Sequence, residues 1–273
     1  MGNCLNQTED SPPEYCTGPS MNEEEHILTG GNIAARVVRI GATVRKPVTA
    51  ATPSVRSLLD CLHDRGYPAS PRHFGTDEQG RQSLEFVPGV MGNAGPPLGL
   101  GDLEQVGRLI RQLHEVTAYF PIPTDARWDV PIRPDHDDLI CHNDLAPWNL
   151  VRSGDRWVFI DWDNAGPGSR LWDLSYAAVT FPPIEPQGDI AEIAPRVGAL
   201  VRGYKLSPSQ GYALPTLMRR RAQAMGDLLV HGTENGLQPW AEMYEADHAR
   251  YWFGAARFVE EHRQALEEVC MNR

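Results

Sequence analysis

The amino-acid sequence predicts an α+β protein with a small strand-rich N-terminal part and a larger, mostly helical C-terminal part. Short extended segments broken by turn residues occupy the first third of the chain, and helical stripes of apolar residues fill the last third. A polar loop between two apolar flanks, LICHNDLAPWNLV, lies near the centre. Strands and helices that occupy different parts of a chain are typical of α+β proteins.

The composition limits the class of protein. A length of 273 residues fits one large domain or two modest ones, with room for a buried core. The net charge of −11 leaves no basic stripe, which argues against a nucleic-acid partner. No apolar run is long enough to cross a membrane. The five cysteines form no CxxC pair, which argues against a disulfide framework or a zinc site and favours a cytoplasmic location.

The chain divides into four parts. Residues 1–26 are rich in Pro, Ser, Glu and Asn and are predicted to be a disordered tail. Residues 27–88 read as a small lobe, with two strands around a turn at Gly41 and an extended segment, SLEFV, near its end. Residues 89–101 are rich in Gly and Pro and read as a hinge or linker. Residues 102–273 then form the helical lobe.

Two helix starts are readable. Thr52 is placed to cap a helix, with Pro53 in its first turn and Gly66 at its end. Asp102 is placed to cap the next one. Each helix carries an apolar stripe at helical spacing, made in the second case of Leu103, Val106, Leu109, Ile110 and Leu113.

The central loop carries the chemistry. His142, Asp144 and Asn149 have the spacing H-x-D-x-x-x-x-N, which is the spacing of the catalytic loop in protein kinases. There the aspartate accepts the proton of the attacking hydroxyl and the asparagine holds a magnesium ion. Asp161 closes the apolar strand that follows and would supply a second metal ligand. The set Asp144, Asn149 and Asp161 is therefore predicted to serve phosphoryl transfer with ATP and Mg2+.

A purely structural interpretation of the same loop stays open. His142 would be an interior histidine with satisfied hydrogen bonds, Asp144 a turn former, and Asn149 a cap. Even within the catalytic interpretation, His142 is expected to support the loop rather than to react.

The segments ICHNDLAPWNLV and WVFIDWDNAGPGSRLWDLSYAA together resemble the aminoglycoside phosphotransferase family, a relative of the protein and choline kinases. The resemblance is strong over residues 137–178 and weak before 50 and after 185. It implies a bilobal protein-kinase-like fold, with ATP between the lobes and magnesium held by Asn149 and Asp161. By the same resemblance Asp173 would be a buried structural aspartate. Asp163 would either face the substrate or touch the metal indirectly.

The small lobe departs from the pattern of kinase-like folds, which use a strand lysine paired with a helix glutamate near the phosphates. The second strand carries Arg45 and Lys46, which point to opposite faces because they are adjacent. Only one of them can face the cleft, and the resemblance favours Arg45. The helix that follows has no glutamate, so the usual ion pair is in doubt.

Two further segments are candidates for nucleotide contacts. Gly30 and Gly31 would let the backbone approach phosphate closely, although a Gly-Gly pair is also an ordinary turn signal. Main-chain groups of Glu85, Phe86 and Val87 are expected to pair with the adenine edge. An ordinary edge strand that ends in a turn would have the same composition.

The acceptor is expected to be a small molecule with a hydroxyl group. The first interpretation is an aminoglycoside or related antibiotic, with choline, homoserine and similar metabolites as alternatives. A late segment rich in acids and aromatics, residues 234–252, would suit a cationic acceptor, but it also fits a solvated helix face. A non-catalytic nucleotide-binding module and a nucleotidyl- or glycosyltransferase are the competing functions. The sequence leaves the oligomeric state open.

Overall fold

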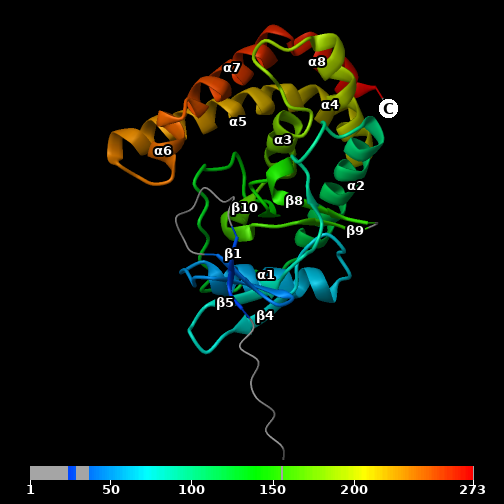
Figure 1. Ribbon diagram of the computed structural model, residues 1–273. Coiled ribbons are helices and arrows are strands. Elements are labelled where there is room, and N and C mark those ends of the chain that lie inside the picture. Colours follow the sequence, from blue (N-terminus) through cyan, green and yellow to red (C-terminus); the bar gives the residue numbers. More distant parts are fainter. Residues whose placement is uncertain (1–23, 29–36, 155, 273) are drawn as a thin grey trace, which may run out of the picture.

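The computed structural model describes residues 24–28, 37–154 and 156–272, and it confirms the α+β class (Figure 1). The small lobe contains an antiparallel sheet with the strand order β1-β2-β3-β5-β4. One helix, α1, connects β3 to β4. Its elements are β1 (His26–Ile27), β2 (Val38–Ile40), β3 (Thr43–Lys46), α1 (Thr52–Asp64), β4 (His73–Thr76) and β5 (Gln82–Glu85). Residues 1–23, most of the expected tail, lie outside the described residues.

The β2–β3 hairpin turns at Gly41, as predicted, and this glycine has a positive φ of 56°. Helix α1 also forms where it was predicted, and its apolar stripe is buried. Its N-cap is Ala51 rather than Thr52, so the predicted cap was wrong by one residue. The Thr52 hydroxyl instead accepts a hydrogen bond from the Thr49 N–H at 2.9 Å, which closes the turn in front of the helix.

The Gly- and Pro-rich segment 89–101 is more than a linker. Its residues Val90–Met91 form β6, which pairs antiparallel with β8 (Leu150–Ser153) in the large lobe. Helix α2 (Leu100–Thr117) begins before this segment ends, with Gly99 as its N-cap. Asp102 is therefore not the cap but the third helical residue, and its carboxylate accepts from the Gly99 N–H at 3.1 Å.

The large lobe contains two small antiparallel sheets, β10-β7 and β6-β8-β9, below a group of helices. The remaining strands are β7 (Leu139–Cys141), β9 (Arg156–Phe159) and β10 (Gly166–Gly168), and two short 3₁₀ turns span Pro147–Asn149 and Trp162–Asn164. The helices are α3 (Arg170–Thr180), α4 (Ile190–Tyr204), α5 (Pro208–Asn235), α6 (Trp240–Glu245), α7 (His248–Glu261) and α8 (Arg263–Met271).

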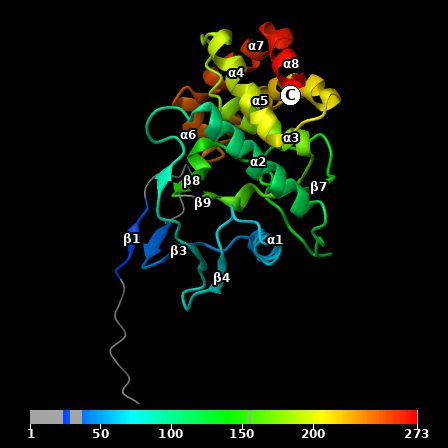
Figure 2. The same ribbon diagram turned by 90° about the vertical axis from the view of Figure 1, so that its right-hand side faces the viewer.

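The two lobes are arranged around the sheets of the large lobe. Figure 1 shows the N-terminal sheet and α1 at one end, β8 to β10 in the middle and helices α4 to α8 at the other end. Helix α2 runs across the junction between the lobes (Figure 2). One apolar core cluster includes side chains of α1 together with those of α2 to α5, α7 and α8, so α1 is packed onto the large lobe. No helix of the described residues is both long and apolar enough to span a bilayer.

Candidate active site

The loop that follows β7 brings Asp144 and Asn149 together. The Asn149 amide donates to the Asp144 carboxylate at 2.9 Å and to the Asp144 main-chain oxygen at 3.0 Å. Asn149 can make these bonds because it ends the 3₁₀ turn that folds the loop back on itself. Asn164 donates to the same carboxylate at 3.5 Å. The carboxylate of Asp144 is therefore held in one orientation by amide donors from two segments.

Electrostatics at Asp144 suit a proton acceptor. Burial raises the pKa of Asp144 above its ordinary value. The charges of His142 and Arg221 oppose this rise, whereas the nearby Asp161 carboxylate adds to it. A carboxylate whose pKa is raised accepts a proton more readily than an exposed one, so the environment favours general-base chemistry.

His142 ties this loop to the strand that precedes Asp161. Its Nδ1 accepts from the Asp144 N–H at 3.3 Å, and its Nε2 donates to the Ile160 carbonyl at 3.1 Å. The ring is fully buried and lies against Trp162, with ring centroids 4.5 Å apart. Both ring nitrogens are thus used for internal bonds, as a supporting role requires.

Asp173 holds the loop from the other side. Its carboxylate accepts from the N–H groups of His142 at 3.1 Å and Asn143 at 2.8 Å, and from His114 Nε2 at 3.0 Å. Burial alone would raise the pKa of Asp173, but the hydrogen bond and charge of His114 keep it below its ordinary value. The His114 ring continues the chain of bonds through Nδ1 to the Tyr204 hydroxyl at 2.8 Å.

His114, Cys141 and Asp173 also have a spacing that could suit a metal ion. The chemistry does not fit one, because both nitrogens of His114 are already hydrogen-bonded. Burial raises the pKa of the Cys141 thiol well above its ordinary value, whereas a metal ligand must be a thiolate. The cluster is a buried hydrogen-bond network.

Two acidic residues, Asp161 and Asp163, follow β9. Asp161 adopts the left-handed conformation, with φ 60° and ψ 64°, just after the end of β9, where the chain changes direction. Lys46 of the small lobe reaches across to both carboxylates, with Nζ 2.8 Å from Asp161 and 2.7 Å from Asp163. Burial alone would lower the pKa of Lys46, but the two carboxylates hold it above its ordinary value. These contacts fix the small lobe against the acidic segment.

The expectation that Arg45 faces the cleft was wrong. Arg45 points to the opposite side of β3, where Nη1 donates to the Ser83 hydroxyl at 2.6 Å and Nε lies 3.3 Å from the Asp77 carboxylate. Its neighbour Lys46 takes the side that meets Asp161, since side chains alternate along a strand. The doubt about a helix partner was justified, because the ion pairs of Lys46 in the described chain are with the large lobe.

The end of β5 offers few free main-chain groups. The N–H groups of Glu85 and Phe86 donate to the carbonyls of Arg72 and Ala42, each at 2.9 Å. The Glu85 carboxylate is bound by both terminal nitrogens of Arg156. Val87 makes no main-chain hydrogen bond within the described residues, so both its N–H and its carbonyl are available to a ligand.

An apolar group lies beside Val87. Val87, Val151 and Val158 form a small buried cluster, with Met91 and Ile160 packed against it. The cluster joins the end of β5 to the strand before Asp161. Gly30 and Gly31, expected to approach the phosphates, lie outside the described residues.

The donor set of the site fits a hard cation. The amide nitrogen of Asn149 is used by Asp144, which leaves its side-chain oxygen as a ligand, and Asp161 supplies carboxylate oxygens. The Asp161 side chain is 37% exposed, so a cation and its water can reach it. Magnesium prefers a few carboxylate or carbonyl oxygens and keeps several waters, which agrees with these donors.

Sequence reasoning missed Arg221 and Tyr176. Arg221 is buried in α5, donates to the Asn143 carbonyl at 2.9 Å, and lies 4.4 Å above the Tyr176 ring. Burial and the nearby charge of Asp144 raise the pKa of Tyr176 well above its ordinary value, and the ring of Tyr176 stacks on Trp252. A signal for Arg221 was present, because it occupies an apolar-stripe position of its helix with Leu217, Met218 and Met225.

The acidic and aromatic segment near the C-terminus divides in two. Its acids, Glu234, Glu242, Glu245 and Asp247, are exposed, which agrees with a solvated face. Trp252 alone of the expected set reaches the site, through its stack on Tyr176.

Comparison with known proteins places this geometry in context. A family model described as a phosphotransferase enzyme family matches residues 121–213, which include the loop and the acidic segment. The trifolitoxin immunity protein of Rhizobium leguminosarum bv. trifolii is 31% identical over 261 residues, covering 89% of this chain and 98% of that protein.

Two solved structures share the fold. A microcompartment-associated aminopropanol kinase has a TM-score of 0.63 at 18% identity, covering 92% of this chain and 94% of that one. An amicoumacin kinase in complex with AMP-PNP and Ca2+ has a TM-score of 0.63 at 13% identity, covering 90% of this chain and 88% of that one. Both likenesses extend over both lobes.

Proposed function

The chain belongs to the phosphotransferase enzyme family, and from this premise we propose that it transfers the γ-phosphoryl group of ATP to a hydroxyl group of a small molecule. The proposal is supported by the bond from Asn149 to Asp144 and by the main-chain bond at 2.8 Å from Ile160, the residue before Asp161, to Asn149. Asn149 bonds Asp144 at 2.9 Å, and the charge of Asp161 contributes to the raised pKa of Asp144. A base and two metal-binding side chains are what phosphoryl transfer requires of a protein.

Each residue has a separate task in this proposal. Asp144 accepts the proton of the acceptor hydroxyl while the new oxygen–phosphorus bond forms and the bond to ADP breaks. Asn149 and Asp161 would hold Mg2+, which would neutralise charge on the phosphate oxygens. Asp163 positions Lys46 or faces the acceptor, and Val87 contributes main-chain groups to the adenine edge.

In this proposal Lys46 also binds phosphate oxygens of ATP, in addition to the carboxylates of Asp161 and Asp163. Its position supports this, because it is the cation of β3 that reaches the acidic segment between the lobes. The cluster of Val87, Val151 and Val158 supplies an apolar surface for the nucleotide base.

We propose an antibiotic or toxin as the acceptor. The relative with 31% identity is named for immunity to trifolitoxin, and one structural neighbour is an amicoumacin kinase. Small metabolites such as choline, homoserine and other amino alcohols are the alternative, which the aminopropanol kinase keeps open. Family membership disfavours a nucleotidyl- or glycosyltransferase.

The test is an ADP-release screen with ATP and Mg2+ against trifolitoxin, aminoglycosides, peptide antibiotics, nucleosides and amino alcohols. One class should give turnover, and Asp144→Ala should lower kcat by roughly 10²- to 10⁴-fold with an unchanged affinity for AMP-PNP. Full turnover by that variant would overturn the role of Asp144. Tight nucleotide binding without turnover on any acceptor would favour a non-catalytic binding module.

A further inference from the structure

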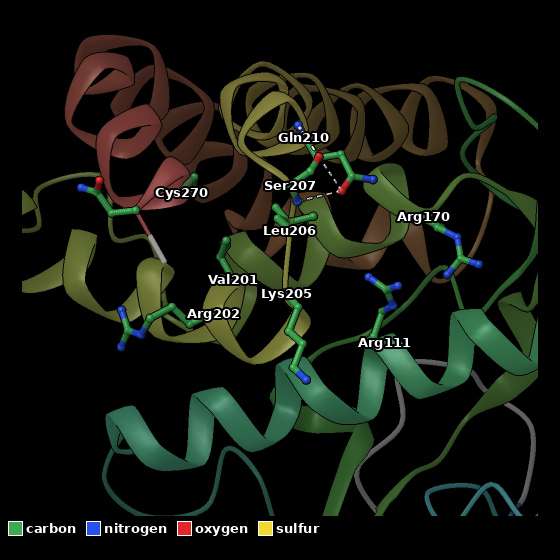
Figure 3. Close-up of a pocket in the computed structure, with 10 residues that line it drawn as sticks. Arg111, Arg170, Val201, Arg202, Lys205, Leu206, Ser207, Gln210 and Cys270 are labelled. Atoms are coloured by element: carbon green, nitrogen blue, oxygen red, sulfur yellow. Dashed lines mark hydrogen bonds between the residues drawn. The ribbon is translucent and has the colours of Figure 1, made fainter.

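A cavity lies in the large lobe, and the residues that line it do not belong to the site around Asp144. It has a volume of about 690 Å³ and lies between α2, the start of α3, the end of α4 and the last residues of the described chain (Figure 3). Arg111, Arg170, Arg202 and Lys205 line it, together with apolar side chains such as Val201 and Leu206. A cavity of this size can hold a small organic molecule.

The charge of the cavity is opposite to that of the protein. The chain carries a net charge of −11, yet no carboxylate side chain lines this cavity. Arg111 and Arg202 are paired with glutamates outside the lining, Glu115 at 2.6 Å and Glu104 at 3.0 Å. The lining of this cavity is therefore basic, although the protein as a whole is acidic.

The other two cations lack an acidic partner among the described residues. Lys205 is exposed and forms no ion pair there. Arg170 lies beside Tyr204, and its Nη1 is buried without a hydrogen-bond partner. A buried guanidinium N–H without an acceptor is costly, so an acceptor supplied by a ligand would stabilise this arrangement.

The two arginines closest to Tyr204 are arranged as a pair. The guanidinium of Arg111 lies 5.7 Å from the centre of the Tyr204 ring, and Arg170 lies near the hydroxyl of the same residue. Figure 3 shows the guanidinium groups of Arg111 and Arg170 near one another, whereas the Lys205 side chain extends toward α2. Two planar donor forks match the oxygens of a phosphate group, and Lys205 adds a further positive charge to the lining.

We propose that this cavity binds a small molecule that carries a phosphate or polyphosphate group. The phosphate oxygens accept from Arg111, Arg170 and Lys205, and the body of the ligand lies along Val201 and Leu206. The cavity is much larger than a single phosphate, which is why an organic ligand rather than the free ion is assigned to it. The proposal does not depend on the reaction at Asp144.

The test is calorimetric titration of the whole protein with inorganic pyrophosphate, in a buffer with a chelator and no divalent cation. We expect saturable binding by the wild-type protein. Lys205→Gln and Arg111→Gln should each weaken it by about tenfold or more, because each removes a charged donor. Arg170→Gln is avoided, since Arg170 is half-buried beside Tyr204.

Three controls make the result decisive. Arg108→Gln removes the same charge from α2, from a side chain that is 53% exposed and does not line the cavity, and binding should be unchanged. Lys46→Gln tests the cleft between the lobes and should also bind normally. Near-ultraviolet circular dichroism of each variant should match the wild type. No binding by the wild type, unchanged affinity in both cavity variants, or loss of binding in Lys46→Gln would each overturn the proposal.

Discussion

The Arg221 guanidinium donates from Nη2 to the main-chain oxygen of Asn143 at 2.9 Å, which joins α5 to the loop that carries Asp144. Asn143 has a positive φ of 63°, a conformation that costs energy for a residue with a side chain. The bond from Arg221 to the Asn143 carbonyl and the bond from the Asn143 N–H to Asp173 hold the peptide groups on both sides of this residue. Arg221 therefore positions the loop that carries Asp144, but we assign it no direct part in the reaction.

Arg221→Met should lower kcat by about 10- to 100-fold, because a small displacement of a catalytic group has effects of that size. KM for ATP should change little, since Arg221 contacts none of the groups assigned to the nucleotide. Burial lowers the pKa of Arg221, and its Nε and Nη1 have no partner, so the folded state gains little stability from this charge. The free energy of unfolding should be unchanged or slightly higher.

Steady-state kinetics and urea unfolding check this, with Arg220→Met as the matched control. Arg220 is the preceding residue in α5, is exposed, and does not touch Asn143. Arg221→Lys should recover part of kcat because it keeps a donor in the same place. Equal kcat values for Arg221→Met and Arg220→Met would contradict a positioning role.

Lys46 and Arg45 provide a second matched pair, since they are adjacent but face opposite sides of β3. Lys46→Gln should lower kcat/KM for ATP by about tenfold or more, because it removes a charged donor from the two carboxylates and from the proposed phosphate site. Arg45→Gln removes contacts to Ser83 and Asp77 and should leave kcat/KM for ATP near the wild-type value. Kinetics at varied ATP concentration measure both. The reverse pattern would restore Arg45 as the phosphate-binding residue.

The sequence was sufficient for features that depend on local spacing. His142, Asp144 and Asn149 lie in one loop, so their approach follows from a single turn. The hairpin at Gly41 and the helical stripes of α1 and α2 are likewise local patterns. Asp161 could be expected beside this loop because only one strand pair separates the two segments.

Long-range relations could not be read in this way. Alternation along β3 requires Arg45 and Lys46 to face opposite sides, but which side meets the large lobe depends on how the sheet docks. The contact between Arg221 and Asn143 joins residues 78 positions apart, and no local pattern specifies it. The pairing of β6 with β8 was hidden because a two-residue strand inside a Gly- and Pro-rich segment resembles a linker.

Protonation of the buried Asp173 carboxylate is expected to lower the stability of the fold in acid. Its folded pKa is below the ordinary value of 3.8, so its contribution to stability is complete above that pH and is lost as the pH falls through the lower folded pKa. Asp173→Asn should cost about 3 kcal/mol near neutral pH, because it disrupts a buried charged network. The difference from the wild type should shrink between about pH 4 and about pH 2, because protonation then removes the charge that the network stabilises. Urea unfolding at steps of roughly 0.5 pH unit measures it. A difference that stays constant over this range would contradict the assignment.

Facing glycines set the distance between α2 and α4. A Cβ on Gly107 would overlap the Leu200 carbonyl oxygen, and one on Gly203 would overlap that of Glu104. Because main-chain atoms cannot move aside as a side chain can, Gly107→Ala should lower the free energy of unfolding by about 2 kcal/mol. Gly101→Ala lies on the same helix with open space around its Cβ, and it should be neutral or stabilising by about 0.5 kcal/mol. Urea unfolding at pH 7 compares the two variants. Equal stabilities would mean that α2 and α4 can separate without cost, and would contradict the close packing that joins α2 to the helical lobe.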